Sequence, residues 1–144
     1  MSSYLVTGCA GFIANEVAAQ LLEAGHHVVG IDNVNDYYDV RLKEHRLQRL
    51  AEYSSDRFEM VRGDIENLET LGSLFETNSF DGVLNLAARA GVRYSMQNPH
   101  VYMTTNAMGS LNLLDQMQKH GVQKYVLAST SSLYAGQPMP FVET

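Results

Sequence analysis

The segment Thr-Gly-Cys-Ala-Gly-Phe-Ile-Ala, residues 7–14, restricts the possible fold more than any other feature. It follows a strand-like run at residues 4–7 and precedes apolar residues spaced as on one face of a helix. Gly8 permits a tight turn from strand to helix, and Gly11 lets a pyrophosphate approach the N–H groups of the helix N-terminus. Ala14 is small enough for close packing of helix on strand. The segment therefore predicts a phosphate-binding first turn.

A carboxylate stands at the matching place after the second strand-like run. Asp32 closes residues 27–31 and lies 24 residues beyond Gly8, close to the spacing of an acid that accepts hydrogen bonds from the adenosine ribose. Its charge repels a 2′-phosphate, so the pattern favours NAD over NADP. The alternative is a glycine-rich turn with a capping aspartate. The predicted cofactor contacts also include the neighbouring residues Phe12, Ile13 and Asn33.

Short β-branched runs alternate with helical periodicity along the chain, which is typical of strand–helix–strand units around a parallel sheet. Right-handed crossovers then predict a Rossmann-like, doubly wound α/β sheet of five strands in the order 3-2-1-4-5. Asn67 is the expected N-cap of the third helix. Strands are expected at residues 4–7, 27–31, 57–61, 82–86 and 122–129, and helices at 11–24, 39–53, 67–76 and 99–120.

Asp64 and Ile65 follow the third expected strand. A polar side chain there can reach the adenine amino group, while its apolar neighbour packs on the ring. The alternative for Asp64 is a turn or N-cap aspartate. We add both residues to the predicted cofactor site.

Charge and cysteine content narrow the classes of partner. The net charge is −6, and the ten basic residues are scattered, which argues against nucleic-acid binding. The only clustered ones, Arg41, Lys43, Arg46 and Arg49, alternate with Glu44 and Glu52 and indicate a solvated helix face rather than an anion site. A single cysteine, Cys9, and no signal peptide or membrane-length apolar run favour a cytoplasmic protein. No metal site is indicated.

Several longer motifs resemble the extended short-chain dehydrogenase/reductase family. They are the glycine loop, Thr-Asn-Ala-Met-Gly-Ser-Leu-Asn-Leu-Leu at residues 105–114 and Ala-Ser-Thr-Ser-Ser-Leu-Tyr-Ala-Gly at residues 128–136. Asn-Asp-Tyr-Tyr-Asp at residues 35–39 and Ala-Gly-Val-Arg-Tyr-Ser at residues 90–95 resemble UDP-glucuronate 4-epimerases and related nucleotide-sugar epimerases. Members of this family oxidise a sugar hydroxyl transiently with bound NAD and return the hydride to the other face. The resemblance therefore implies NAD as cofactor and a nucleotide sugar as substrate.

The resemblance also implies roles for particular residues. Thr130 matches the catalytic hydroxyl, four residues before Tyr134. Leu86, Ala87 and Ala88 match strand-end residues that run past the cofactor. Asn106 matches an asparagine that supports the active-site loop. The residues that match the sugar side of the cleft are Val92, Arg93 and Ser95. Plainer alternatives are a strand-end cap for Thr130, a helix-surface amide for Asn106 and a surface charge for Arg93. Two positions depart from the pattern: Ala135 replaces glycine and Arg89 replaces glutamine.

The acid–base motif Tyr-x-x-x-Lys of that family is absent, since none of the eight tyrosines has lysine four residues later. A sixth strand is likewise not supplied after Tyr134. We therefore expect residues 1–144 to be the N-terminal part of an NAD-binding domain, inactive alone and self-associating into a homo-oligomer through the fifth strand. A fragment of a longer epimerase, a short NAD-binding or sensing module without catalysis, and a degenerate gene product remain the three explanations.

Overall fold

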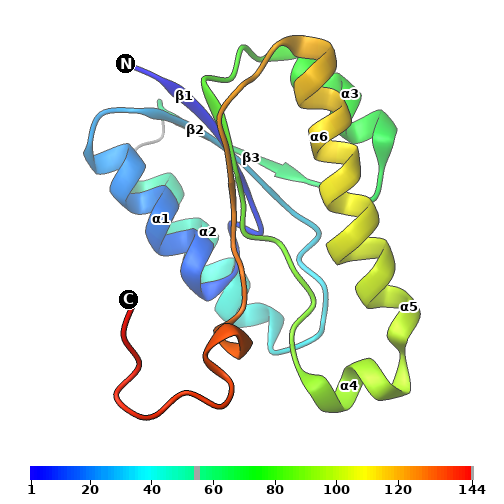
Figure 1. The fold of residues 1–144 in the computed structure, drawn as a ribbon. Coiled ribbons are helices and arrows are strands. Elements are labelled where there is room, and N and C mark those ends of the chain that lie inside the picture. The colour runs from blue at the N-terminus through cyan, green and yellow to red at the C-terminus, as the bar shows by residue number, and fades with distance from the viewer. Residues whose placement is uncertain (54–55, 144) are drawn as a thin grey trace.

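The computed structural model describes residues 1–53 and 56–143 of the chain. Five parallel strands form one sheet in the order β3-β2-β1-β4-β5, with helices over both faces (Figure 1). This confirms the predicted strand order and the doubly wound fold class. The strands are β1 (Ser3–Thr7), β2 (His27–Asp32), β3 (Phe58–Arg62), β4 (Gly82–Asn85) and β5 (Tyr125–Leu127).

Two pairs of helices flank the sheet. One face carries α1 (Phe12–Glu23) and α2 (Val40–Tyr53), and the other carries α3 (Leu68–Thr77) and α6 (Gly109–His120) (Figure 1). Asn67 caps α3 as predicted, because its side chain accepts a hydrogen bond from the Thr70 N–H at 3.0 Å. None of the helices in the described ranges is both long and apolar enough to span a bilayer.

The region between β4 and α6 differs most from the prediction. A short helix, α4 (Val92–Gln97), was not predicted, and the single helix expected over residues 99–120 is divided. It begins as α5 (Pro99–Tyr102), passes through a π-helical segment, η1 (Met103–Met108), and continues as α6. A π turn has i→i+5 hydrogen bonds in place of i→i+4. The segment has only six residues, too few for its wider period to be recognised in the sequence.

The last strand is also shorter than predicted. β5 spans three residues instead of the eight expected, because it pairs only with the four-residue β4. A 3₁₀ turn, η2 (Ser131–Tyr134), follows it. Val126 and Leu127 of β5 are each 55% exposed, so this edge of the sheet carries apolar surface.

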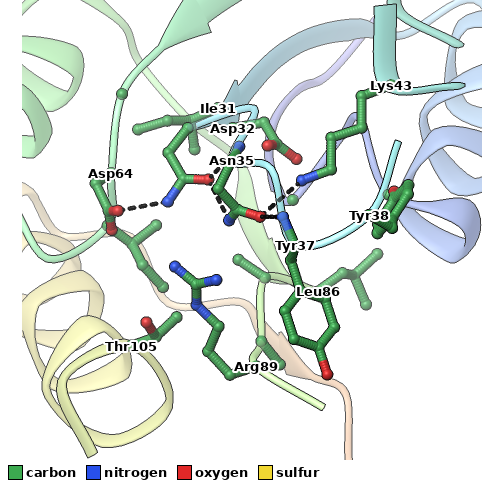
Figure 2. Close-up of a pocket in the computed structure, with 17 residues that line it drawn as sticks. Ile31, Asp32, Asn35, Tyr37, Tyr38, Lys43, Asp64, Leu86, Arg89 and Thr105 are labelled. Carbon is green, nitrogen blue, oxygen red and sulfur yellow. Dashed lines mark hydrogen bonds between the residues drawn. The ribbon is translucent and has the colours of Figure 1, made fainter. Parts of the chain in front are cut away.

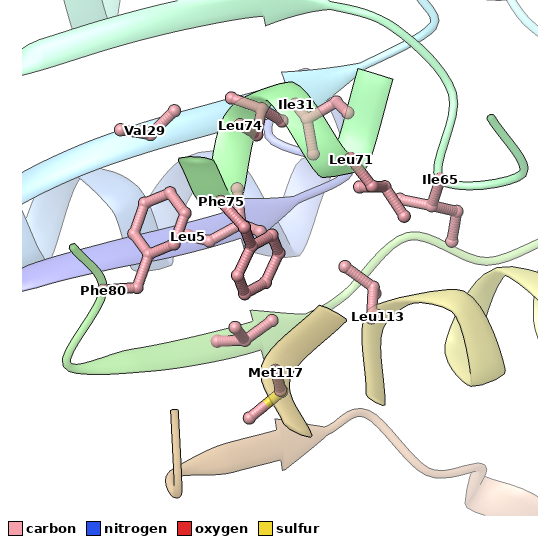
Figure 3. Packing of buried hydrophobic residues seen from close by; sticks show 11 residues of the cluster. Leu5, Val29, Ile31, Ile65, Leu71, Leu74, Phe75, Phe80, Leu113 and Met117 are labelled. Atoms are coloured by element: carbon pink, nitrogen blue, oxygen red, sulfur yellow. The ribbon is translucent and has the colours of Figure 1, made fainter. Parts of the chain in front are cut away.

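The core has two parts because neighbouring strand residues point to opposite faces. Leu5 of β1 packs with α3 and α6, whereas Val6 packs with α1 and α2. Figure 3 shows the first part, in which Leu71, Phe75 and Leu113 of the helices meet the sheet. Burial of each of these side chains stabilises the folded state by about 1.5–3 kcal/mol. The sheet is therefore a rigid platform whose carboxyl edge is free for a ligand.

Candidate functional site

A cavity opens at the carboxyl ends of the strands, beside β1, where the strand order reverses. Ligands of doubly wound sheets bind at this switch point. Figure 2 shows the side chains that surround the cavity. Most of the predicted cofactor residues line it: Gly8, Gly11, Asp32, Asn33, Asp64, Ile65, Leu86, Ala87 and Ala88.

The glycine loop has the geometry of a phosphate cradle. Gly8 has φ +71°, and a Cβ there would lie 2.9 Å from the Ala87 Cα, so a side chain is excluded on both counts. The Gly11 N–H donates to the Gly8 carbonyl at 2.7 Å. Gly11 is also the N-cap of α1, and no side chain caps that helix. Its first N–H groups are thus available to an anion.

Two predicted residues of this loop point elsewhere. The Phe12 and Ile13 side chains are 79% and 64% exposed and do not line the cavity. Their backbone N–H groups belong to the first turn of α1, so only a main-chain contact with phosphate suits them. Their place in the cofactor set stays a prediction.

Asp32 ties the end of β2 to the glycine loop. Its Oδ2 accepts from the Ala10 N–H at 3.1 Å, and its Oδ1 accepts from the Val34 N–H at 2.7 Å. Next to it, Asn33 donates from Nδ2 to Asp64 Oδ2 at 2.6 Å. These bonds fix two carboxylates, those of Asp32 and Asp64, at the cavity wall.

Lys43 corrects the prediction of a solvated helix face. Arg41 is exposed as expected, but Lys43 is only 4% exposed and lines the cavity. Its Nζ donates to Asn35 Oδ1 at 3.0 Å and lies 4.7 Å from the centre of the Tyr38 ring. Burial lowers the pKa of Lys43. The positive charges of Arg89 and Arg46 lower this pKa further, whereas the negative charge of Asp32 raises it.

The loop after β2 supplies further cavity residues that the sequence reasoning did not assign. Asn35, Tyr37 and Tyr38 all line the cavity. Arg46 joins this loop to the glycine turn, since its Nη1 donates to the Tyr38 hydroxyl at 2.8 Å and to the Ala10 carbonyl at 3.3 Å. The motif at residues 35–39 could have predicted these cavity residues, because it is a feature of the family that the sequence resembles. The sequence analysis assigned no ligand contact to it.

A second pocket lies beside the first, between the loop after β4 and the chain after β5. The two pockets share Ala87, Ala88 and Arg89. Besides Ala87 and Ala88, its lining includes four more of the residues expected from the resemblance: Val92, Ser95, Asn106 and Thr130. Arg93 lines neither pocket.

Thr130 and Asn106 have defined partners. The Thr130 Oγ1 accepts from the Ser132 N–H at 3.1 Å and caps η2. Asn106, within the π segment, holds the backbone of Arg89 twice: the Arg89 N–H donates to Oδ1 at 2.7 Å, and Nδ2 donates to the Arg89 carbonyl at 3.0 Å. The π turn therefore positions the wall that the two pockets share.

Two tyrosine hydroxyls form hydrogen bonds to the residue that follows this shared wall. The Tyr37 and Tyr102 hydroxyls both donate to the Ala90 carbonyl, at 2.7 and 2.8 Å. Partial burial and the neighbouring Tyr37 raise the pKa of Tyr102. The hydrogen bond from Tyr37 thereby connects the loop after β2 to the loop after β4.

Comparison with known proteins identifies the family. The family model for GDP-mannose 4,6 dehydratase matches residues 5–144. The chain belongs to this family. It is 53% identical over 99% of its length to UDP-glucuronate 4-epimerase of Thermodesulfobacterium geofontis and 43% identical to a probable UDP-glucuronate 4-epimerase of Rhizobium meliloti. It spans 44% and 41% of those two proteins, less than half of each.

Solved structures agree with the sequence relatives. A UDP-glucuronic acid 4-epimerase variant from Bacillus cereus, in complex with a UDP-fluorosugar and NAD, matches 98% of the chain with a TM-score of 0.84 and 35% identity, over 44% of that enzyme. A UDP-glucose 4-epimerase from Bifidobacterium longum, in complex with NAD⁺ and UDP, gives 0.85 and 29% over 99% of the chain and 41% of that enzyme. The resemblance to nucleotide-sugar epimerases is confirmed.

Proposed function

We propose that this chain is the NAD-binding part of an NAD-dependent UDP-sugar 4-epimerase, and that the first cavity holds the ADP half of NAD. The observation that carries the proposal is the pairing of an uncapped helix N-terminus at Gly11 with Asp32 in one cavity. The residues present fit the cofactor, since the cradle at Gly8 excludes a Cβ. Similar proteins that carry NAD in their structures support the same assignment.

The roles of the cavity residues follow from their chemistry. The α1 N–H groups would take the pyrophosphate, the Asp32 carboxylate the ribose hydroxyls, and Asp64 with Ile65 the adenine. NAD, when bound, takes a hydride from the sugar and returns it to the other face. In the second pocket we propose that Thr130 contacts the reacting hydroxyl and that Val92, Arg93 and Ser95 contact the nucleotide sugar.

The cofactor assignment is tested by calorimetric titration of the purified chain with NAD and NADP. NAD should bind, and NADP should bind at least about tenfold more weakly, because the Asp32 charge opposes a 2′-phosphate. Asp32→Asn removes that charge and should narrow the difference. Absence of NAD binding by a chain shown to be folded by circular dichroism contradicts the proposal.

The epimerase assignment is tested by sequencing the gene that encodes this chain. Its reading frame should continue past the codon for Thr144 into a helix with Tyr-x-x-x-Lys. The protein it encodes should interconvert UDP-glucuronate and its C4 epimer. A frame that stops there would favour a stand-alone NAD-binding module instead.

Two further properties are proposed for the protein in its setting. In the purified 1–144 chain, the apolar edge at Val126 and Leu127 would pair with another copy, giving a homo-oligomer. The single cysteine, which is buried and unpaired, suits the reducing conditions of the cytoplasm.

A further inference from the structure

Arg89 belongs to the wall that the two pockets share, but its side chain has been given no role so far. Arg89 lines the first cavity with Asp64 and Thr105. Figure 2 shows its guanidinium pointing into the cavity, toward the side that carries those two residues. Within the described ranges, no hydrogen bond or ion pair engages that guanidinium. It is a cation directed into the cavity, without a hydrogen-bond or ion-pair partner among the residues that the structure describes.

Hydrogen bonds hold the main chain of Arg89, whereas its guanidinium has no hydrogen-bond partner among the described residues. Asn106 holds both the N–H and the carbonyl of Arg89, at 2.7 and 3.0 Å. Tyr37 and Tyr102 hold the next carbonyl, that of Ala90. The main chain from which the Arg89 side chain extends into the cavity is therefore held in place.

The nearby carboxylates do not call for an arginine. Asp64 already accepts from Asn33 through Oδ2 and from the Glu66 N–H through Oδ1, at 2.6 and 3.0 Å. On the other side Arg89 and Lys43 repel, since the charge of Arg89 helps to lower the pKa of Lys43. A contact with bound ligand explains the position better than a contact with protein.

The walls of this region favour a flat base. Ile65 is buried and lines the cavity together with Leu86 and Arg89. A planar ring between aliphatic walls and a guanidinium is held by apolar packing on one side and by a cation–π contact on the other. Of the parts of NAD, the adenine is the one that Asp64 and Ile65 receive in the proposed function.

We propose that Arg89 stacks its guanidinium on the adenine ring of the bound ADP moiety. The glutamine expected at this position from the family resemblance has no charge and would lack the cation–π contact. Arg89 thus strengthens the hold on the ADP half of the cofactor. This inference rests on the proposed function.

Calorimetric titration of the chain with ADP-ribose tests it, at low and at high salt. The variants are Arg89→Gln and Arg89→Lys. Arg41→Gln is the matched control, because that guanidinium pairs with Asp39 on the surface and lines neither pocket. Arg89→Gln should weaken binding about five- to tenfold at both salt concentrations. Arg89→Lys should also weaken it at both, because an ammonium lacks the planar face that stacks on a ring. Arg41→Gln should change it less than about twofold.

Other results separate the possible failures. Unchanged affinity in Arg89→Gln overturns the stacking contact and leaves the proposed function standing. Wild-type affinity in Arg89→Lys, or a loss seen only at low salt, overturns it in favour of a simple charge contact with phosphate, because such contacts are screened. Failure of the folded wild-type chain to bind ADP-ribose overturns the proposed function and this inference together.

Discussion

Thr7 and Asn85 are joined across β1 and β4 by a buried hydrogen bond of 2.7 Å from the Thr7 hydroxyl to Asn85 Oδ1. The same hydroxyl accepts from the N–H groups of Leu86 and Ala87, at 3.1 and 3.0 Å. Asn85 Nδ2 in turn donates to Ser110 Oγ and to the Tyr125 hydroxyl. One side chain on β1 therefore fixes the start of the loop that lines both pockets.

Thr7→Val should lower the free energy of unfolding by about 2–4 kcal/mol, because it leaves two backbone N–H groups and an amide oxygen without their partner. Thr7→Ser keeps the hydroxyl and loses only a buried methyl, so its cost should be about 1 kcal/mol. Urea denaturation of the two variants measures the difference. Equal losses would mean that the methyl, and not the hydroxyl, matters at this position.

Gly8→Ala should destabilise the chain by about 2 kcal/mol or more, because the residue has a positive φ and a Cβ would meet the Ala87 backbone. Gly72→Ala is the control. Gly72 lies within α3, and a Cβ there would meet nothing within 4 Å. That variant should gain up to about 1 kcal/mol from helix propensity. Thermal unfolding of both checks the opposite signs, and a neutral Gly8→Ala would refute the cradle geometry.

Cys9 should resist labelling in the folded chain. Its side chain is fully buried, and burial is the first cause that raises the pKa of the thiol far above the ordinary value of 9.0. A thiol reagent should react slowly in buffer and rapidly in urea. Rapid reaction of the native chain would show that the glycine loop opens readily.

The same pKa shift predicts a dependence of stability on pH. Above about pH 9 the unfolded thiol loses its proton while the folded thiol keeps it, so the contribution of Cys9 is complete below that pH and falls as the pH rises. The stability difference between wild type and Cys9→Ala should shrink by about 1.4 kcal/mol from pH 8 to pH 10. Urea titrations at the two pH values measure it. A constant difference would contradict the buried thiol.

Self-association should depend on the edge at β5. Sedimentation velocity should show concentration-dependent dimers for the wild-type chain and monomers for Val126→Lys, which places a charge on the edge. Val142→Lys changes a valine that is 63% exposed and lies outside the sheet, and it should not alter the distribution. A wild-type chain that stays monomeric at high concentration rejects the proposal.

The sequence predicted the sheet well and the cavity partly. Strand order follows from the alternation of strands and helices with right-handed crossovers, and Gly8 and Asp32 follow from their spacing. Lys43 was misread, because the period of an amphipathic helix does not separate a solvated lysine from one whose ammonium reaches a cavity. The two hydrogen bonds between Asn106 and Arg89 depend on a π segment of six residues, which is too short to show its own period in the sequence.

The central claim is that the first cavity binds the ADP half of NAD. Titration of the isotopically labelled chain with NAD, followed through backbone amide resonances, tests it most directly. The account predicts that the amides that move most are those of Gly8 to Ile13, Asp32 to Asn35, and Asp64 with Ile65. No movement at saturating NAD, or movement confined to residues outside this cavity, would contradict it.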